Sequence, residues 1–335
     1  MNKFKYYFIL LVATISLFSC SKNDTPGAEP LRDYAVQYAT DIATIEEYLQ
    51  TYYITVTNNP GGTDDQDVVY TKIPTGGTQP SIWSYKDNAG FPKLLSRNVS
   101  IHDITYKLYY LVLREGTGES PSNVDAVMAS YKGVYLEQVT ADNVTTLTAT
   151  SFEEVKFPQS FFNLNGTIIG WSEIFPQFKT GTYTSNADGT VSHANFGAGI
   201  MFIPSGLAYY ATGSSSIPSY SPLVFSFKSY EIQRLDHDND GIPSYLEDLD
   251  GDGYIYDYRN TINYPTTPAV NKDDTDGDSI PDFLDVDDDG DKYTTLLERK
   301  YIDSNGATKY YDFASIPLCT GGNGKKRYLD PSCHD

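Results

Sequence analysis

Oxygen-bearing side chains recur at a fixed spacing in residues 236–247. Aspartates occupy the first, third and fifth positions, Gly241 the sixth and a glutamate the twelfth. Ca²⁺ is a hard cation that takes about six to eight oxygen ligands, and alternate side chains of such a loop can converge on it while the glycine lets the chain turn. The backbone carbonyl after the glycine would be a further ligand. The spacing therefore predicts a calcium site whose ligands are Asp236, Asp238, Asp240, Ile242 and Glu247.

The same pattern returns in incomplete form along the rest of residues 236–298. The second set has Arg259 in place of the final carboxylate, the third ends in an aspartate, and the fourth lacks the glycine at its sixth position. The ligands predicted for these sets are Asp248, Asp250 and Asp252; Asp274, Asp276, Asp278 and Asp285; and Asp287, Asp289, Asp291 and Glu298.

The cadence Asp-Gly-Asp-x-Ile-Pro-Asp over residues 276–282 resembles thrombospondin type 3 repeats, which contain EF-hand-like loops. The resemblance implies that aspartates of neighbouring repeats share ions and that little hydrophobic core exists. Because close carboxylates repel one another, we expect the segment to be ordered with Ca²⁺ and loose without it. The alternative is an acidic linker that binds no ion.

The formal net charge of −20 restricts the partners of this 335-residue chain. A nucleic-acid partner is not expected, because phosphate binding needs a basic surface. The charge suits a protein that binds cations, or one that must merely stay soluble. The chain is expected to be a monomer.

The N-terminus is typical of an export signal. A short basic region precedes the apolar stretch Phe8–Phe18, which is too short for a permanent membrane helix. Leu17-Phe-Ser-Cys20 resembles the lipobox of bacterial lipoproteins, with a plain secretory signal as the alternative. The resemblance implies that residues 1–19 are removed, that Cys20 is lipidated, and that residues 20–30 form a tether. We therefore expect a lipid-anchored protein of the bacterial cell envelope, at the outer membrane.

The middle of the sequence predicts one long helix followed by many short strands. Apolar residues recur at steps of three and four over residues 31–52, which predicts an amphipathic helix. The rest of residues 31–99 is irregular and suggests no role. The predicted strands are Thr105–Arg114, Val124–Tyr131, Leu147–Val155, Ile200–Ile203 and Leu223–Tyr230, with one short helix, Ser172–Phe178. This pattern predicts an α+β domain over residues 100–235, whose antiparallel sheet wraps around the short helix.

Short motifs follow one another in a set order between residues 100 and 232. They are Ala129-Ser-Tyr-Lys-Gly133, Phe152-Glu153, Thr167-Ile-Ile-Gly-Trp171, Ile203-Pro-Ser205, Leu207-Ala-Tyr209, Ile217-Pro218 and Leu223-Val-Phe-Ser-Phe227. No single motif is specific, but their order and spacing resemble the FKBP family of peptidyl-prolyl isomerases. The resemblance implies a bent antiparallel sheet around a short helix, with an aromatic pocket between them.

The family resemblance also implies which residues form that pocket. They would be Tyr131, Phe152, Glu153, Phe157, Thr167, Ile168, Trp171, Tyr209 and Phe225, with Phe161 as the alternative to Phe157. Trp171 would form the floor, the backbone N–H of Ile168 would donate to a substrate carbonyl, and Tyr209 would bind substrate from the rim. A catalyst of rotation about an X–Pro bond only has to bind the twisted amide better than the planar one, so isomerisation needs no cofactor. The expected partners are proline-containing polypeptides.

Three features depart from the family pattern and would weaken activity. Glu153 stands where the family has Asp, and Tyr210 replaces a Gly after the rim tyrosine, where it could narrow the entrance. Residues 183–199 are a polar insertion with a turn signal at Asp188-Gly189. Two other functions stay open: a non-catalytic module that binds proline-containing partners, and a calcium-dependent adhesion or structural surface lipoprotein. The aromatic residues could also be ordinary core, since Tyr and Phe are abundant.

Two cysteines occupy the C-terminal tail, residues 299–335. Cys319 and Cys333 could pair in an oxidising envelope compartment and close a small loop. Two free thiols are the alternative.

Overall fold

The computed structural model describes residues 30–333, so the predicted signal 1–19 and Cys20 lie outside the described residues. The chain divides into two units after Arg32, and every element below belongs to the unit that begins at Asp33. Within residues 30–333, no helix combines the length and the apolarity that crossing a membrane requires.

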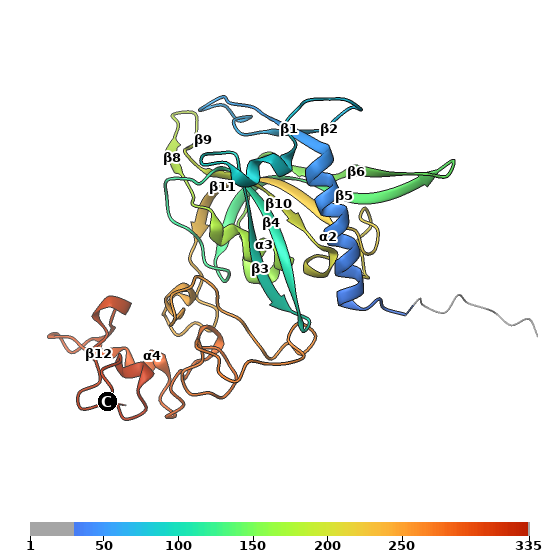
Figure 1. Cartoon of the computed structure of the whole chain (residues 1–335). Coiled ribbons are helices and arrows are strands. Elements are labelled where there is room, and N and C mark those ends of the chain that lie inside the picture. The colour runs from blue at the N-terminus through green and yellow to red at the C-terminus, as the bar shows by residue number, and fades with distance from the viewer. Residues whose placement is uncertain (1–29, 334–335) are drawn as a thin grey trace, which may run out of the picture. The chain divides into compact units, whose positions relative to one another are not determined.

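An antiparallel sheet of seven strands forms the centre of this unit (Figure 1). The strands are β3 (Lys93–Ile101), β4 (Ile104–Arg114), β5 (Ala126–Ala141), β6 (Val144–Val155), β7 (Phe162–Asn163), β10 (Gly197–Ile203) and β11 (Leu223–Gln233). Their order is β3–β4–β10–β11–β5–β6, and β7 pairs with the start of β5. The curled antiparallel sheet with few helices is the α+β class that the sequence predicts. The domain boundary expected at residue 100 falls inside β3.

One face of the sheet packs against the short helix α3 (Ile169–Ile174) and the 3₁₀ turn η3 (Phe175–Gln177) that continues it. Side chains alternate between the two faces along a strand. On β4, Leu108 and Tyr110 face this side and share a core with Trp171 and Phe175. The helix begins at Ile169, three residues before the Ser172 predicted from the sequence. This early start places Trp171 inside the helix.

The opposite face of the sheet is covered by helix α2 (Tyr34–Thr51). Asp33 caps the helix, since its side chain accepts a hydrogen bond from the N–H of Val36 at 3.0 Å. The alternate β4 residues Tyr109 and Leu111 pack with Ile45, Tyr48 and Leu49 of α2 in a second buried core. The N-terminal region therefore closes the second face of the sheet, a role that its sequence does not indicate.

Two small hairpins and three short 3₁₀ helices complete this part of the chain. Two of these helices are η2 (Leu164–Gly166) and η4 (Ser205–Leu207). β1 (Tyr52–Val56) pairs with β2 (Val68–Lys72), and η1 (Ile82–Asp87) precedes β3. β8 (Thr182–Ser185) pairs with β9 (Val191–Ala194) around Asp188-Gly189, so the polar insertion forms the expected hairpin.

The acidic segment after β11 is built mainly from loops. Its short elements are η5 (Ser244–Leu246), η6 (Asp282–Leu284), α4 (Thr295–Glu298), β12 (Lys300–Ile302), β13 (Thr308–Tyr310), η7 (Phe313–Ser315) and η8 (Arg327–Leu329). Its largest core is a cluster of four buried residues, Ile242, Ile316, Tyr328 and Leu329. A disulfide joins Cys319 to Cys333 across a sequence separation of 14 residues, which contributes about 3 kcal/mol in the chain-entropy account.

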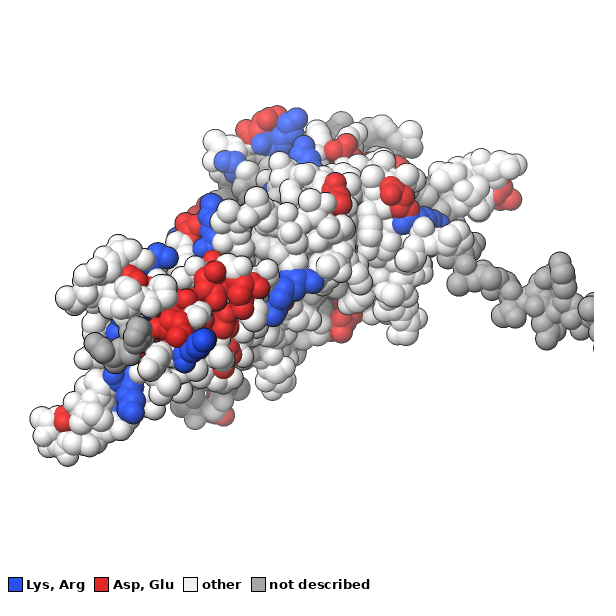
Figure 2. Space-filling view, turned by 90° about the horizontal axis from the view of Figure 1, so that it is seen from below, with Lys and Arg blue, Asp and Glu red and all other residues white. Residues whose placement is uncertain are grey.

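Carboxylates gather on one side of the molecule. Figure 2, seen from below, shows Asp and Glu side chains concentrated in one patch bordered by a few Lys and Arg. The described residues contain four groups of three or more acidic side chains that lie close together, all of them between Asp238 and Asp291.

Candidate functional site

A cavity of about 510 Å³ opens between the sheet and α3. Its lining includes seven of the nine pocket residues expected from the sequence: Tyr131, Glu153, Thr167, Ile168, Trp171, Tyr209 and Phe225. Phe162, Gly166, Ile169 and Ala208 complete the lining. The residues come from β5, β6, β7, β11, α3 and the loop after β10, so only the folded chain brings them together.

Trp171 lies at the centre of an aromatic cluster in this cavity. Its ring centroid is 4.9 Å from that of Tyr131 and 5.1 Å from that of Phe225, both in edge-on contact. Phe162 lies 4.9 Å away on another side. Edge-to-face contacts of this kind hold rings in set orientations. These contacts give the cavity an aromatic floor.

Phe152 supports the cavity without lining it. Its ring meets that of Phe225 edge-on at 5.5 Å. β6 has a bulge at this point, because Gly133 of β5 pairs with Glu153 while Val134 pairs with Ser151. The extra residue lets both Phe152 and Glu153 face the same region. A Cβ on Gly133 would lie 2.4 Å from Cζ of Phe152, so only glycine leaves room for this ring.

Phe157 does not belong to the pocket, which corrects the expectation from the sequence. Its side chain is 66% exposed and lines a different cavity, together with Pro158 and His193. Phe162 takes the place in the pocket wall, so Phe161 is not the equivalent either. The reason is the two-residue strand β7, in which Phe162 pairs with Val127. Phe161 and Phe162 are adjacent in the sequence, and the pairing of β7 with β5 decides which of the two side chains points into the pocket.

Polar groups occupy one side of the pocket. Burial raises the pKa of Tyr131 to about 12, and the charge of Glu153 and a hydrogen bond to its carboxylate add to the effect. The pKa of Tyr209 is also raised, by burial first and by Glu153 second. Both phenols therefore stay protonated at neutral pH and can donate hydrogen bonds. Tyr209 is 39% exposed, which places its hydroxyl-bearing ring at the rim.

Ile168, at the start of α3, lines the cavity and carries a backbone N–H group. Ile168 is the N-terminal cap of the helix, and within residues 30–333 its N–H donates to no protein atom. Such an N–H is available to a carbonyl oxygen of a bound peptide.

Tyr210 does not narrow the entrance, contrary to the expectation from the sequence. It has a positive φ of 45°, and its ring stacks on Tyr34 of α2 at 4.3 Å. Its side chain is not part of the cavity lining. The left-handed backbone at Tyr210 thus turns this large side chain toward α2.

The acidic segment contains a second candidate site, for a metal ion. Carboxylate oxygens of Asp238, Asp240, Glu247 and Asp288 lie within 4.8 Å of one another. Asp288 was not among the predicted ligands; it comes from the fourth acidic set and completes the first loop. The sequence offers one sign of this role: Asp288 is an additional aspartate between the alternating aspartates of the fourth set.

Two of these carboxylates, those of Glu247 and Asp288, are buried without a hydrogen-bond partner among the described residues. Glu247 and Asp288 are each 1% exposed, and neither oxygen of either side chain has a hydrogen-bond partner within residues 30–333. Burial, followed by the neighbouring carboxylates, raises the pKa of Glu247 to about 11 and that of Asp288 to about 10. Buried anions are strongly destabilising unless a cation balances them. Four oxygen donors around one point fit the preference of Ca²⁺.

The other predicted ligands fall into three further groups. Within each group the carboxylate oxygens lie within 4.8 Å of one another; the groups are Asp248, Asp250 and Asp273; Asp274, Asp276 and Asp278; and Asp287, Asp289 and Asp291. Asp273 is not among the ligands predicted from the sequence. The remaining predicted carboxylates lie outside these groups. Asp236, Asp252 and Asp285 accept hydrogen bonds from backbone N–H groups of their own loops. Glu298 is buried, and its pKa is raised to about 9 by burial and then by Asp289 and Asp291.

The Ile242 side chain contributes to packing, and the role of its backbone carbonyl as a ligand stays a prediction. Its side chain is buried in the small core of the acidic segment, and its N–H donates to Asp240 at 2.6 Å. That hydrogen bond shapes the loop that carries the first group of carboxylates.

Part of the chain is similar to known isomerases. It is 31% identical over 126 residues to the FKBP-type peptidyl-prolyl cis-trans isomerase FkpA of Escherichia coli strain K12, and equally to FkpA of strains O6:H1 and O157:H7. The match covers 38% of this chain and 38% of the relative, so the chain spans less than half of the length of these proteins.

Similar solved structures include a peptidyl-prolyl cis-trans isomerase of Pseudomonas syringae pv. tomato, with 22% identity, a TM-score of 0.29, and coverage of 45% of this chain and 87% of that one. The crystal structure of FkpA from Escherichia coli has 25% identity and a TM-score of 0.30, and the match covers 45% of this chain and 55% of FkpA.

The acidic segment matches a different group of proteins. A family model described as BamM C-terminal matches residues 237–326, which contain all four groups of carboxylates. The isomerase match shows that the chain has homology to FKBP-type peptidyl-prolyl isomerases over 126 residues, and a different family model matches its C-terminal part.

Proposed function

We propose that this protein is a peptidyl-prolyl cis-trans isomerase of the bacterial cell envelope that acts on X–Pro bonds of proline-containing polypeptides. The observation that carries the proposal is the convergence of Tyr131, Glu153, Trp171, Tyr209 and Phe225 on one cavity, which has an aromatic floor and polar groups on one side. The homology to FKBP-type isomerases supports the same activity.

The proposed mechanism uses binding rather than bond chemistry. Amide resonance sets a barrier of about 18–20 kcal/mol to rotation about the peptide bond. The prolyl ring would sit over Trp171, in an environment that favours the less polar, twisted amide over the planar one. The Ile168 N–H and the Tyr209 hydroxyl would hold the peptide on either side of the rotating bond. Interactions that strengthen as the amide twists lower the barrier.

A kinetic assay tests this proposal. The rate of cis-to-trans conversion of a short X–Pro peptide should rise in proportion to enzyme concentration. Trp171→Ala should abolish the acceleration, and Tyr209→Phe should reduce it about tenfold, because a hydrogen bond to the turning peptide is lost. Tyr183→Phe is the matched control, since Tyr183 is exposed on the β8–β9 hairpin. Saturable peptide binding without acceleration would instead indicate a non-catalytic proline-binding module.

The envelope location rests on the predicted lipid anchor. We propose that Cys20 carries the lipid and holds the protein at the outer membrane. A Cys20→Ser variant should move from the membrane fraction to the soluble fraction of the same cells. A variant that still sediments with membranes would contradict the lipid anchor and leave the isomerase proposal untouched.

A second candidate function is calcium binding by the acidic segment. The supporting observation is the group Asp238, Asp240, Glu247 and Asp288, in which both carboxylate oxygens of Glu247 and of Asp288 are buried and accept no hydrogen bond from the described residues. The ion would be structural, holding loops that have little hydrophobic core. Calorimetric titration of chelator-treated protein with CaCl₂ should show saturable binding, and MgCl₂ should compete poorly because Mg²⁺ demands an octahedral site. If calcium serves adhesion, Ca²⁺-dependent partner binding should survive the Trp171→Ala substitution.

A further inference from the structure

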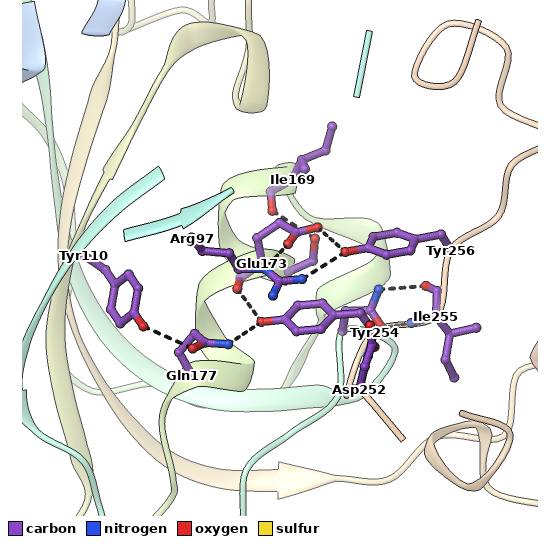
Figure 3. Close-up of polar contacts among 11 residues, drawn as sticks. Arg97, Tyr110, Ile169, Glu173, Gln177, Asp252, Tyr254, Ile255 and Tyr256 are labelled. Atoms are coloured by element: carbon purple, nitrogen blue, oxygen red, sulfur yellow. Dashed lines mark hydrogen bonds and ion pairs between the residues drawn. The ribbon is translucent and has the colours of Figure 1, made fainter. Parts of the chain in front are cut away.

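Two tyrosines of the acidic segment contact the helix that carries the pocket floor (Figure 3). The Tyr254 hydroxyl donates to the backbone carbonyl of Glu173 at 2.8 Å. The Tyr256 hydroxyl donates to Oε1 of the same residue at 3.0 Å. Glu173 follows Trp171 by two positions in α3, so both contacts act on the pocket helix itself.

Glu173 is a buried carboxylate that depends on these contacts. It is 1% exposed and forms an ion pair with Arg97 of β3, whose Nε lies 2.7 Å from Oε2. Burial raises the pKa of Glu173, and Arg97 opposes this rise. A buried ion pair stabilises a fold only when its remaining hydrogen-bonding capacity is satisfied. Tyr256 supplies that bond and also accepts from Arg97 at 3.2 Å.

Tyr254 extends the contact to the other end of the helical turn. Its ring lies under the Arg97 guanidinium, 3.4 Å from centroid to Cζ. Its hydroxyl accepts from Gln177 at 2.8 Å, and Gln177 accepts from Tyr110 of β4 at 3.1 Å. The tyrosine therefore links both α3 and η3 to the sheet.

A helix as short as α3 needs such external contacts. It has six residues, and isolated helices of that length are unstable in water. Trp171 fixes the inner side of α3 within the aromatic cluster. On the opposite side, Glu173 and Gln177 are held by Tyr254 and Tyr256.

The tyrosines are themselves held in place by the isomerase part of the chain. The Asn123 side chain donates to the Ile255 carbonyl at 2.7 Å and accepts from the Ile255 N–H at 2.8 Å. This paired contact fixes the backbone between the two tyrosines. The N–H of Tyr254 also donates to Asp252 at 2.8 Å, at the end of the second acidic loop.

We propose that Tyr254 and Tyr256 are positioning residues for the isomerase site. Through Glu173 they hold α3 so that Trp171 and the Ile168 N–H stand where the substrate amide must rotate. The proposal rests on the isomerase function proposed above. It makes the acidic segment part of the working site, although its sequence predicts a separate segment.

The test compares Tyr254→Phe, Tyr256→Phe and the double variant with wild type, all in the full chain. Tyr310→Phe is the matched control, because it removes the same hydroxyl from an exposed side chain in β13. The chain has two tryptophans, so a Trp83→Phe background makes Trp171 the sole fluorescence reporter of the pocket floor. The readouts are kcat and KM for an X–Pro peptide, acrylamide quenching of Trp171, and the thermal unfolding midpoint.

The double variant should lose about tenfold or more in kcat, with a smaller change in KM, because a displaced helix weakens transition-state binding most. Trp171 should become more accessible to acrylamide, and Tyr310→Phe should match wild type in both readouts. Wild-type kcat and quenching in the double variant would overturn the proposal. If the double variant unfolds, Tyr256→Phe alone decides by the same two readouts. If wild type shows no isomerase activity, the proposed function fails, and quenching alone decides whether the tyrosines position α3.

Discussion

Asp41 accepts two hydrogen bonds from Ser205, a residue 164 positions away in the sequence. The backbone N–H of Ser205 lies 2.7 Å and its hydroxyl 2.6 Å from the same carboxylate oxygen. Asp41 belongs to α2, whereas Ser205 begins the 3₁₀ helix η4 (Ser205–Leu207) that leads to Tyr209. The N-terminal helix therefore anchors the loop that carries the rim of the pocket.

The first prediction follows from this anchor. Asp41 is buried, so Asp41→Ala would leave the Ser205 N–H and hydroxyl without acceptors. Each buried unsatisfied group costs about 1–3 kcal/mol, and the variant should be destabilised by about 2–4 kcal/mol in urea unfolding. Isomerase activity should fall as well, because Tyr209 loses its support.

Glu47→Ala on the same helix is the control for this experiment. Glu47 is exposed and accepts a hydrogen bond from Gln138 on the surface. Its removal should change stability by less than about 0.5 kcal/mol. Equal effects of the two substitutions would show that the loss reflects helix α2 in general and not the bond to Ser205.

The second prediction concerns the space behind the pocket. Gly133→Ala would place a Cβ 2.4 Å from the Phe152 ring and 2.8 Å from that of Phe225. Both rings must shift, which costs about 1–3 kcal/mol and moves the Phe225 wall into the cavity. We expect weaker peptide binding and a lower unfolding midpoint. Gly90→Ala, where a Cβ meets nothing within 4 Å, should leave both quantities unchanged.

Much of the pocket was predictable because its residues lie on a few regular elements, in which the spacing along the chain determines where each side chain points. Ile168 and Trp171 lie on one short helical turn, and Tyr131 and Phe225 lie on paired strands. Their spacing along the chain is therefore linked to their position in space. Phe162 was not predictable in this way, since its facing depends on a two-residue strand whose pairing partner is 35 positions away.

The predicted calcium ligands also show that local spacing does not predict contacts between distant parts of the chain. Alternation of aspartates within a loop is a local property, and it correctly indicates that Asp238 and Asp240 lie close together. Asp288 joins them only because the acidic segment folds back on itself, so the spacing of ligands within one loop does not predict its position. Likewise, the hydrogen bonds of Tyr254 and Tyr256 to Glu173 span about 80 residues, and nothing in the sequence of either partner indicates them.

The third prediction is a pH dependence of stability from His102. Burial lowers the pKa of this side chain to about 4, against the hydrogen bond with Asn263 that raises it. The ring stacks on Tyr34 at 3.8 Å, and its Nδ1 lies 3.1 Å from the Tyr106 hydroxyl. Because the folded-state pKa lies below the unfolded value of about 6.5, protons bind the unfolded chain more readily between these two values. The contribution of His102 is therefore present above pH 6.5 and is lost as the pH falls toward 4.

The measurement is urea unfolding at several pH values between 4 and 8, for wild type and His102→Asn. Asparagine tolerates the positive φ of 57° at this position, so the backbone should be kept. The variant should lose stability at neutral pH through the missing stack, and its curve should approach that of wild type as the pH falls. Parallel curves over the whole range would rule out titration of His102 as a cause.

The fourth prediction is that the Asp288 carboxylate lowers the unfolding temperature without calcium and raises it with calcium bound. In chelator, Asp288 is a buried acid surrounded by Asp240, Asp238 and Asp282. Burial raises the pKa of Asp288 to about 10, so without calcium at pH 7 this carboxylate must take up a proton when the chain folds. Asp288→Asn keeps the shape and does not carry this cost, so the calcium-free variant should unfold at a higher temperature than calcium-free wild type. With saturating Ca²⁺ the order should reverse, because the variant lacks a charged ligand and binds the ion about tenfold or more weakly.

Asp142→Asn in the β5–β6 turn is the control for this reversal. Asp142 has a positive φ of 52°, which asparagine also accepts, and it belongs to none of the four carboxylate groups. Its substitution should shift neither the calcium-free nor the calcium-loaded unfolding temperature. If Asp288→Asn lowers both temperatures by the same amount, Asp288 serves packing alone, and the first acidic loop does not need it to hold an ion. The crossing of the two unfolding temperatures thus distinguishes a ligand from a structural acid, because only a bound cation stabilises the ionised form of this buried side chain.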